Sequence, residues 1–294
     1  MAQATPSNQV QDLSAAFAHL VATATPGIVT VQSDRSRSSG FCWRSGLIVT
    51  ADEALSEEGD FAVTLSGGES VAAQLVGRDH TTDIALLRVD RSDLPPVHLD
   101  SPPLAVGALT LAVGAEDGAP TAAFGVVSHS AGRWWSLRSG EIDARIELDL
   151  RMRQSAEGGL AIEAAGRAFG MTVFGPRRRV LVIPSATIER VAARLEKYGH
   201  IPRGYLGLGF QLVAIGEGRR GVMVMKVEPR GPGAKAGVHQ GDIIVTWNGE
   251  PIRHVRSILR ALGPDSVGQT VTLGLRRAGE TKEIPLTIAE RPIT

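Results

Sequence analysis

Hydrophobic and polar residues follow two different patterns along this 294-residue chain. Residues 10–23 repeat apolar positions at intervals of three and four, which predicts a helix that ends before Pro26. Beyond Pro26 the apolar segments are short and are bounded by Gly, Pro, Ser or Asp, as expected for β-strands packed in a sandwich or barrel. We expect strands at 27–33, 46–50, 61–67, 70–77, 83–90, 109–114, 122–130, 142–150, 167–175 and 179–185.

A second helix is predicted over residues 185–199, because a serine opens the segment, apolar residues recur at helical spacing and Gly199 stops it. The chain then passes a boundary and starts a new pattern of strands, with one clear helix near 254–262. The sequence "WNGE" at 247–250 is typical of a tight hairpin turn. We therefore predict three parts, at 1–25, 26–199 and 200–294.

Composition agrees with a globular, mainly β protein and argues against some partners. Hydrophobic residues make up 43% and charged residues 21% of the chain, and its 34 glycines suit many turns. Lysine plus arginine and aspartate plus glutamate number 31 each, so no broad attraction to nucleic acid or anionic lipid is expected. No apolar run reaches the length of a membrane span.

The first residues and the one cysteine bear on the cellular compartment. The N-terminus lacks a basic start and an uninterrupted apolar segment, so we expect no signal peptide and a cytoplasmic protein. If Met1 is not the natural first residue, the periplasm is the alternative. Cys42 is the single cysteine, which excludes an internal disulfide, and we expect it to be a small buried hydrophobe.

Motifs along nearly the whole chain carry a family resemblance. They include "PGIVTVQS", "SGFCWRSGLIVTA", "DHTTDIALLRVD", "RQSAEGGLA", "LVIPSATIERVAARL" and "RGYLGLGF", in this order. The chain thereby resembles the HtrA/Deg family, in which a chymotrypsin-like double β-barrel precedes a PDZ domain. The resemblance implies an N-terminal helical segment at 1–25, a trypsin-like double barrel at 26–199 and a PDZ domain at 200–294.

The same motifs place the positions of the family's catalytic triad. The run "TADEAL" matches the segment that carries the family's histidine, so Glu53 stands at that position. Asp83, which opens "DIALL", matches the aspartate. The run "SAEGGLA" matches the nucleophile motif, so Glu157 stands at the serine position and Ser155 at the first glycine of the oxyanion loop.

These residue types predict that the chain is not an enzyme. Serine-type hydrolysis needs a hydroxyl nucleophile and an imidazole that takes up its proton and passes it to the leaving amine. An ionised Glu53 is a much weaker base than histidine, and an anionic Glu157 opposes the negative charge of the transition state. We therefore expect a degenerate family member without protease activity, a pseudoprotease.

One alternative retains serine-type endopeptidase activity through displaced residues. Ser155 lies two positions before Glu157 and becomes a candidate nucleophile if the loop shifts its register. His80, three positions before Asp83, is the candidate for a relocated base. We expect His80 to be an ordinary exposed loop histidine instead.

The acidic residues of the cleft offer a second alternative. If the barrel is native-like, Glu53, Asp83 and Glu157 converge, and close carboxylates either take up a proton or bind a cation such as Ca²⁺ or Mg²⁺. We favour the simpler outcome, in which the two glutamates face water or pair with an arginine such as Arg151 or Arg153. No metal and no cofactor are expected.

The C-terminal part is expected to bind peptides. The run "GYLGLG" resembles the family's carboxylate-binding loop, so Tyr205, Leu206, Gly207 and Leu208 are the expected binding residues, with backbone amides as donors. The peptide would add a strand beside this segment, and Ile258 is a candidate for the groove wall. The alternative is a PDZ domain that is purely structural or has an occluded groove.

Two apolar features point to partners. The helix that carries Phe17 and Leu20 resembles the family's trimerisation segment, which implies a homo-oligomer. The adjacent Trp134 and Trp135 face opposite sides of a strand, so one is expected in the core and the other is open to a partner. The predicted function is binding of C-terminal or unfolded peptides, or regulation of an active HtrA relative by mixed assembly.

Overall fold

The computed structural model describes residues 6–34, 36–57, 59–216 and 219–292. The chain divides into two compact units, Met1–His200 and Ile201–Thr294, and each is described by itself. Residues 1–5 of the predicted N-terminal segment lie outside the described residues.

Helix α1 (Pro6–Ala24) opens the first unit and is longer than the helix predicted at 10–23. A short 3-10 turn, η1 (Thr25–Gly27), joins it to the first barrel. The Phe17 ring packs against Phe124, with ring centroids 4.7 Å apart, so the helix contacts the barrels through an aromatic pair.

The first barrel is a closed six-stranded sheet with the strand order β1-β2-β3-β6-β5-β4. Its strands are β1 (Ile28–Ser33), β2 (Ser36–Arg44), β3 (Leu47–Thr50), β4 (Phe61–Thr64), β5 (Ser70–Asp79) and β6 (Ile84–Val89).

The second barrel is also closed and six-stranded, in the order β11-β14-β13-β12-β7-β8. Its strands are β7 (Leu109–Glu116), β8 (Ala119–Ala131), β11 (Arg145–Asp149), β12 (Leu160–Glu163), β13 (Ala168–Phe174) and β14 (Val180–Pro184). A small two-stranded sheet of β9 (Trp134–Trp135) and β10 (Glu141–Ile142) and the 3-10 turns η2 (Gln154–Ala156) and η3 (Pro176–Arg178) complete its loops.

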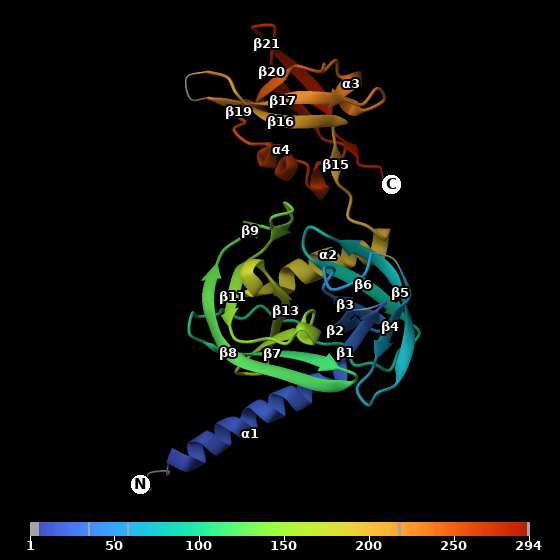
Figure 1. Ribbon diagram of the computed structural model, residues 1–294, viewed down its shortest axis with the longest axis vertical. Coiled ribbons are helices and arrows are strands. Elements are labelled where there is room, and N and C mark those ends of the chain that lie inside the picture. Colours follow the sequence, from blue (N-terminus) through green and yellow to red (C-terminus); the bar gives the residue numbers. More distant parts are fainter. Residues whose placement is uncertain (1–5, 35, 58, 217–218, 293–294) are drawn as a thin grey trace. The chain divides into compact units, whose positions relative to one another are not determined.

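Figure 1 shows the two barrels side by side, and the prediction of a mainly β double barrel is confirmed. Helix α2 (Ser185–Tyr198) follows the second barrel and packs against strands of both barrels. Gly199 ends it in the left-handed conformation (φ 73°), the stop that the sequence predicted.

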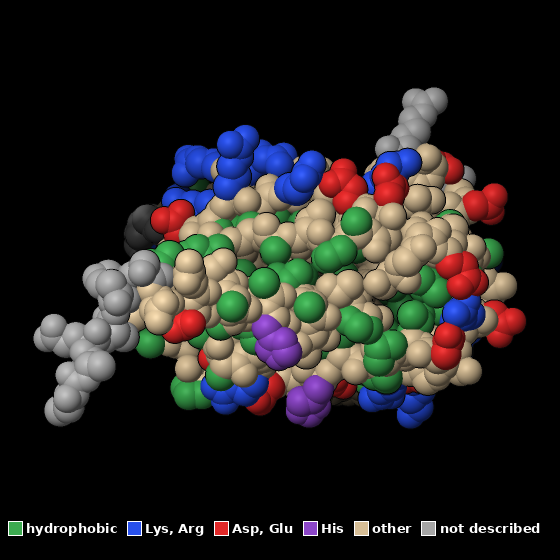
Figure 2. Space-filling view, turned by 90° about the horizontal axis from the view of Figure 1, so that it is seen from below, with side chains coloured by type: hydrophobic (Ala, Val, Ile, Leu, Met, Phe, Trp, Pro, Cys, Tyr) green, Lys and Arg blue, Asp and Glu red, His purple; other side chains and the backbone are tan. Residues whose placement is uncertain are grey.

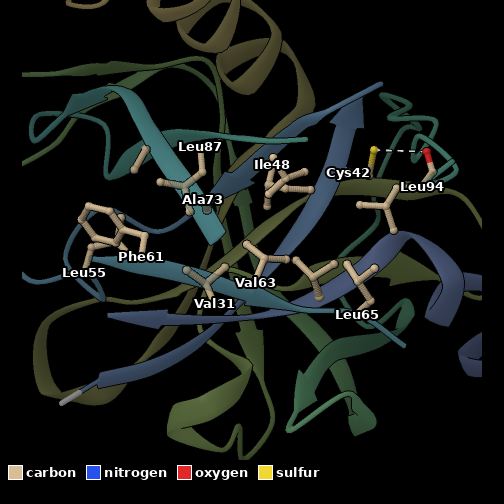
Figure 3. Close-up of a cluster of buried hydrophobic side chains, with 13 residues drawn as sticks. Val31, Cys42, Ile48, Leu55, Phe61, Val63, Leu65, Ala73, Leu87 and Leu94 are labelled. Atoms are coloured by element: carbon tan, nitrogen blue, oxygen red, sulfur yellow. Dashed lines mark hydrogen bonds between the residues drawn. The ribbon is translucent and has the colours of Figure 1, made fainter. Parts of the chain in front are cut away.

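The core of the first barrel is a cluster of buried hydrophobic side chains that includes Cys42 (Figure 3). The Cys42 Sγ lies 3.5 Å from the Leu94 carbonyl oxygen, and burial raises the pKa of the thiol to about 11. A thiol that stays protonated is a poor nucleophile. The prediction that Cys42 serves as a buried hydrophobe is confirmed.

The second unit contains a sheet in the order β16-β17-β18-β20-β21, with β19 paired to β18, and a separate pair of β15 and β22. The strands are β15 (Gly204–Tyr205), β16 (Leu208–Ala214), β17 (Arg220–Val227), β18 (Ile243–Trp247), β19 (Glu250–Pro251), β20 (Thr270–Arg277), β21 (Glu280–Thr287) and β22 (Ala289–Glu290). The helical elements are α3 (Pro232–Lys235), α4 (Val255–Ala261) and the 3-10 turn η4 (Pro264–Ser266).

Two strands differ from the predicted pattern. Strand β2 was not predicted, and a turn in which Gly46 has φ 71° separates it from β3, which was. Strand β12 was not predicted either, and it begins inside the run that resembles the nucleophile motif. The "WNGE" hairpin is confirmed, because Trp247 pairs with Glu250 and both Asn248 and Gly249 have positive φ.

The surface carries charges of both signs. Figure 2 shows acidic and basic side chains spread over one face, with a group of basic side chains at its upper left. This mixture agrees with the formal net charge of zero. Among the described residues, no helix combines the length and apolar character needed to cross a bilayer.

Candidate functional site

Glu157 is held in a tight turn between the two barrels. Its backbone carbonyl accepts a hydrogen bond from the Ser39 N–H at 2.7 Å. The following Gly158 has φ 84°, and a Cβ at this position would lie 2.2 Å from the Ser39 carbonyl oxygen. Only glycine fits there, which explains why a glycine follows Glu157.

The Glu157 side chain points into the protein rather than into water. It is only 5% exposed, and its two carboxyl oxygens accept hydrogen bonds from the Phe174 N–H (3.1 Å) and from Gln154 Nε2 (2.8 Å). The prediction was that the glutamates face water or pair with an arginine, and Glu157 does not face water. Burial raises the pKa of Glu157 above its usual value, because desolvation outweighs the two donors.

Asp83 and Glu53 contact each other in loops of the first barrel. The Glu53 N–H donates to Asp83 Oδ1 at 2.7 Å, and Asp83 adopts the left-handed conformation (φ 60°) just before β6. The Glu53 side chain is 49% exposed and lies 3.3 Å from Arg138. Glu53 therefore does pair with an arginine, although Arg138 is a partner that the sequence did not indicate.

The three carboxyl groups act on one another electrostatically. Desolvation is the largest of the effects that together raise the pKa of Asp83 from 3.8 to about 8; the negative charges of Glu53, Glu157 and Asp52 add to it, and the hydrogen bond from the Glu53 N–H opposes it. Asp83 is therefore protonated at neutral pH. The structure brings Glu53, Asp83 and Glu157 into one neighbourhood, where they can hold a proton.

Cation binding by this trio finds no support in the geometry. In the part of the chain that the structure describes, no three acidic, histidine or cysteine side chains are grouped closely enough to hold a metal ion. Arginine side chains supply the positive charge near these carboxyl groups. The charge of Arg178 lowers the pKa of Glu157, against the effect of burial, and Arg138 forms an ion pair with Glu53. Of the two arginines named beforehand, Arg153 lies 3.4 Å from Glu116.

A histidine–aspartate pair lies beside these carboxyl groups. His80 Nδ1 is 2.6 Å from Asp52 Oδ2, and Arg78 Nε is 2.7 Å from the other Asp52 oxygen. His80 is exposed, as predicted, but its ring is oriented by a buried carboxylate. Sequence reasoning missed Asp52, although it lies directly before Glu53.

Ser155 is placed in the turn η2, two residues before Glu157. Its side chain is 9% exposed, and its carbonyl oxygen accepts a hydrogen bond from Ser39 Oγ at 2.7 Å. Among the described residues, no hydrogen bond joins Ser155 to His80. The structure therefore does not bring this serine and this histidine into contact.

A hollow of about 850 Å³ lies next to Glu157. Gln154 and Phe174 line it and also bond to the Glu157 carboxylate, so these two residues connect the hollow with Glu157. Arg151 and Arg178 are in its wall as well, and the Arg178 guanidinium lies 4.4 Å from the Phe174 ring centre. Arg153 and Asp149 line it too, so basic side chains outnumber the acidic one in its wall.

The predicted peptide-binding loop lies in the second unit, between β15 and β16. The carbonyls of Leu206 and Gly207 accept hydrogen bonds from Gly233 and Glu228. In the described part of the chain, neither the Leu206 nor the Gly207 N–H donates a hydrogen bond. Both residues are buried, and a buried amide without a partner is costly, so a ligand carboxylate that reached this loop would satisfy them. Tyr205 and Leu208 flank them, and the Tyr205 hydroxyl bonds Glu228, which raises the pKa of Tyr205.

Strand β16 is the edge of its sheet and pairs only with β17, and α4 lies alongside it (Figure 1). Ile258 of α4, the candidate for the groove wall, is 0% exposed and belongs to the buried core of this unit. Leu208, Phe210 and Val255 pack against that core and are only partly buried. These three side chains present the apolar surface between β16 and α4.

Two family models match the chain, a trypsin-like peptidase domain over residues 38–171 and a PDZ domain over residues 204–288. A relative named "Probable periplasmic serine endoprotease DegP-like" from Bartonella henselae is 32% identical over 272 residues, which are 86% of this chain and 53% of the relative. A protein of the same name from Brucella suis is 30% identical over 273 residues, 87% of this chain and 53% of the relative. The chain thus spans about half the length of the curated relatives it matches.

Solved structures show the same fold. A serine endoprotease from Yersinia pestis has a TM-score of 0.74 and 27% identity, and the match covers 94% of this chain and 98% of that one. The HtrA-type protease AlgW with a decapeptide has a TM-score of 0.75 and 22% identity, over 95% of this chain and 99% of that one.

These comparisons correct two predictions. The prediction that the chain is not an enzyme is contradicted, because its relatives are named serine endoproteases and the matching family model is a peptidase domain. The relatives are also named periplasmic, which favours the periplasmic alternative over the cytoplasmic prediction.

The raised pKa of Asp83 predicts a pH-dependent stability. Between about pH 4 and pH 8 the folded state holds a proton that the unfolded state releases, so stability falls as the pH rises through this range. Asp83→Asn keeps an oxygen acceptor for the Glu53 N–H and does not titrate. We expect the free energy of unfolding of the wild type to fall more than that of Asp83→Asn between about pH 5 and about pH 9, measured by urea denaturation.

The control is Asp90→Asn, which removes an exposed carboxylate just after β6. It should follow the pH profile of the wild type. Parallel profiles for the wild type and Asp83→Asn would show that Asp83 is ionised in the folded protein at neutral pH.

Proposed function

Because the chain belongs to the HtrA/Deg family, in which a trypsin-like peptidase domain is followed by a PDZ domain, we propose that it binds the C-terminal ends of peptides and unfolded proteins at its PDZ unit. The observation that carries the proposal is the pair of amides at Leu206 and Gly207, which have no partner among the described residues and lie next to the edge strand β16. Backbone amides can hold a terminal carboxylate, and an edge strand can accept the peptide as an additional strand.

Charge around the loop supports the same assignment. A hollow of about 490 Å³ is lined by Tyr205 of the loop and by Arg230 and Lys235. Glu228 and Glu290 line it as well, and the Tyr205 hydroxyl bonds Glu228. Arg230 and Lys235 thus share a hollow with Tyr205 of the loop, and a charge-assisted hydrogen bond from either to a terminal carboxylate is stronger than a neutral one.

The groove offers apolar side chains for the last residues of the peptide. Leu208 and Phe210 project from β16 and Val255 from α4, and all three are partly buried against the core that contains Ile258. A hydrophobic peptide side chain inserted here would extend that core. The proposed ligand therefore ends in an apolar residue with a free carboxylate.

A second candidate function is peptide-bond hydrolysis at the trypsin-like unit, the activity named for the relatives. The observation that favours it is the short His80–Asp52 contact of 2.6 Å, because a carboxylate that orients an imidazole is one half of a serine-protease mechanism. His80 Nε2 is then the nitrogen that accepts a proton. The hydroxyl would come from Ser155, which is nearly buried, so the turn η2 has to shift before a substrate reaches it.

We further propose that the chain forms a homo-oligomer, a trimer by family resemblance, through α1. Leu13 is 47% exposed and Val10 more so, and both lie on the helix whose Phe17 contacts Phe124. Phe124 itself is exposed despite that contact. A second copy would cover these apolar side chains, which form an unusual group for a free helix.

The peptide proposal predicts a strong effect of the terminal carboxylate. A peptide with an apolar last residue and a free C-terminus should bind at least about tenfold more tightly than its C-terminal amide, because a charged hydrogen bond contributes about 1.5–3 kcal/mol. Gly207→Ala should weaken binding, because its Cβ would lie 2.9 Å from the Gly231 Cα. Fluorescence anisotropy with a labelled peptide measures both effects.

The control for the loop variant is Gly249→Ala. Gly249 also has a positive φ, but a Cβ there meets nothing within 4 Å. It should bind the peptide as the wild type does. Equal affinity for the acid and the amide would show that the loop does not recognise a carboxylate.

The hydrolysis candidate predicts that Ser155→Ala and His80→Gln each lower the cleavage rate of a denatured protein by more than about a hundredfold. Ser45→Ala, which removes an exposed hydroxyl that bonds the Ser92 carbonyl, should leave the rate unchanged. Gel electrophoresis of the digest and labelling by a serine-directed phosphonate are the measurements. Cleavage that survives Ser155→Ala, or labelling elsewhere, would rule out Ser155 as the nucleophile.

The assembly proposal predicts that Leu13→Glu shifts the sedimentation coefficient toward that of a monomer, because it places a charge in the apolar contact. Gln11→Glu adds the same charge at an exposed polar position of α1 and should sediment as the wild type does. A monomeric wild type at micromolar concentration in analytical ultracentrifugation would contradict the proposal.

A further inference from the structure

A second hollow in the PDZ unit, of about 860 Å³, is lined by basic side chains. Arg219 and Arg220 at the start of β17, Arg253 and His254 before α4, and Arg276 of β20 surround it. Among the described residues of its wall there is no aspartate or glutamate. The positive charge of this lining favours the binding of an anionic group.

Three of these arginines have no acidic partner among the residues that the structure describes. In the described part of the chain, no carboxylate lies within ion-pair distance of Arg220, Arg253 or Arg276. The next residue on β20 differs, because Arg277 lies 2.7 Å from Asp242. Like charges held around one hollow repel one another, and a bound anion would relieve that repulsion.

The hollow lies at one end of the proposed peptide groove. Strand β16 forms one wall of that groove and ends at Ala214, and the hollow includes the next residue, Ile215. Helix α4 forms the other wall and begins at Val255, and the hollow includes Arg253 and His254 just before it. Both walls of the groove therefore continue into the hollow.

The direction of a bound peptide follows from the carboxylate loop. The loop lies at the start of β16, so a peptide anchored there runs antiparallel to β16, and its upstream residues approach Ala214. Strand β16 spans Leu208–Ala214, and a strand rises about 3.4 Å per residue, which gives about 20 Å. Peptide residues about five to eight positions before the C-terminus would therefore reach the hollow.

We propose that the hollow lined by Arg220, Arg253 and Arg276 binds acidic side chains located about five to eight residues upstream of the C-terminus of a bound peptide. This proposal rests on the proposed peptide-binding function and adds a second recognition element to it. The apolar end of the peptide fills the groove at Leu208 and Phe210, and the acidic segment neutralises the arginines. The preferred ligand combines an acidic segment with an apolar C-terminal end.

The test uses the full chain and two labelled ten-residue peptides. Both share an apolar four-residue C-terminal end with a free carboxylate, and the upstream residues are Asp and Glu in one and Asn and Gln in the other. The acidic peptide should bind about five- to tenfold more tightly at low salt, since exposed ion pairs each contribute up to about 1 kcal/mol. The difference should shrink at about 0.5 M salt, because the charges are screened.

The double variant Arg253→Gln/Arg276→Gln should lose this preference while it binds the neutral peptide within about twofold of the wild type. Arg88→Gln, which removes an exposed arginine from β6 of the barrel unit, is the control and should change neither affinity.

The outcomes separate this proposal from the function on which it rests. If both peptides bind the wild type equally, or if the double variant keeps the preference, the arginine-lined hollow is not a peptide subsite and carboxylate-dependent binding still stands. If neither peptide binds, the proposed peptide-binding function fails, and the subsite fails with it.

Discussion

The hydrogen bonds of one buried serine fix the loop on which the cleft depends. Ser39 is fully buried in β2 of the first barrel, and its N–H donates to the Glu157 carbonyl. Its hydroxyl donates to the Ser155 carbonyl at 2.7 Å and accepts from the Ala115 N–H of the second barrel at 2.8 Å. A buried polar group is costly unless each of its atoms is satisfied, so Ser39 holds both barrels and the turn in one arrangement. Any chemistry at Glu157 or Ser155 is performed on a turn whose position the first barrel sets.

The electrostatic state of the cleft follows from that position. The turn buries the Glu157 carboxylate close enough to Asp83 for its charge to raise the pKa of the aspartate, and desolvation contributes the larger part. Two kinds of contact stabilise these carboxyl groups. Backbone and amide N–H groups bond the buried carboxyls, whereas the exposed Glu53 pairs with Arg138. At this site the proton is held by the carboxyl group of Asp83, whereas in a site built on an imidazole alone the histidine holds it.

Much of the fold could be read from the sequence, because strand alternation and turn residues are local signals. Gly199 ended its helix as predicted, and "WNGE" formed its hairpin. Strand β2 was not among the predicted strands, because residues 36–39 are all polar and hide the alternation. In the cleft, the family motifs indicated which carboxyl groups converge. They could not indicate Arg138, because the chain brings that residue to Glu53 from a loop 85 positions away only when the barrels close.

In the PDZ unit, the sequence indicates where the groove lies more readily than which side chains line it. Helix α4 has only seven residues, and the sequence pattern of so short a helix does not determine which side chains face the groove and which face the core. Ile258 turns inward to the core, and Val255, about one turn earlier, is left at the groove. The amides at Leu206 and Gly207 do not depend on such a rotation, because the carbonyls of the same residues are tied to Gly233 and Glu228. Recognition by these backbone groups tolerates side-chain substitution in a way that a side-chain cleft does not, since a substitution replaces the side chain and leaves the amide in place.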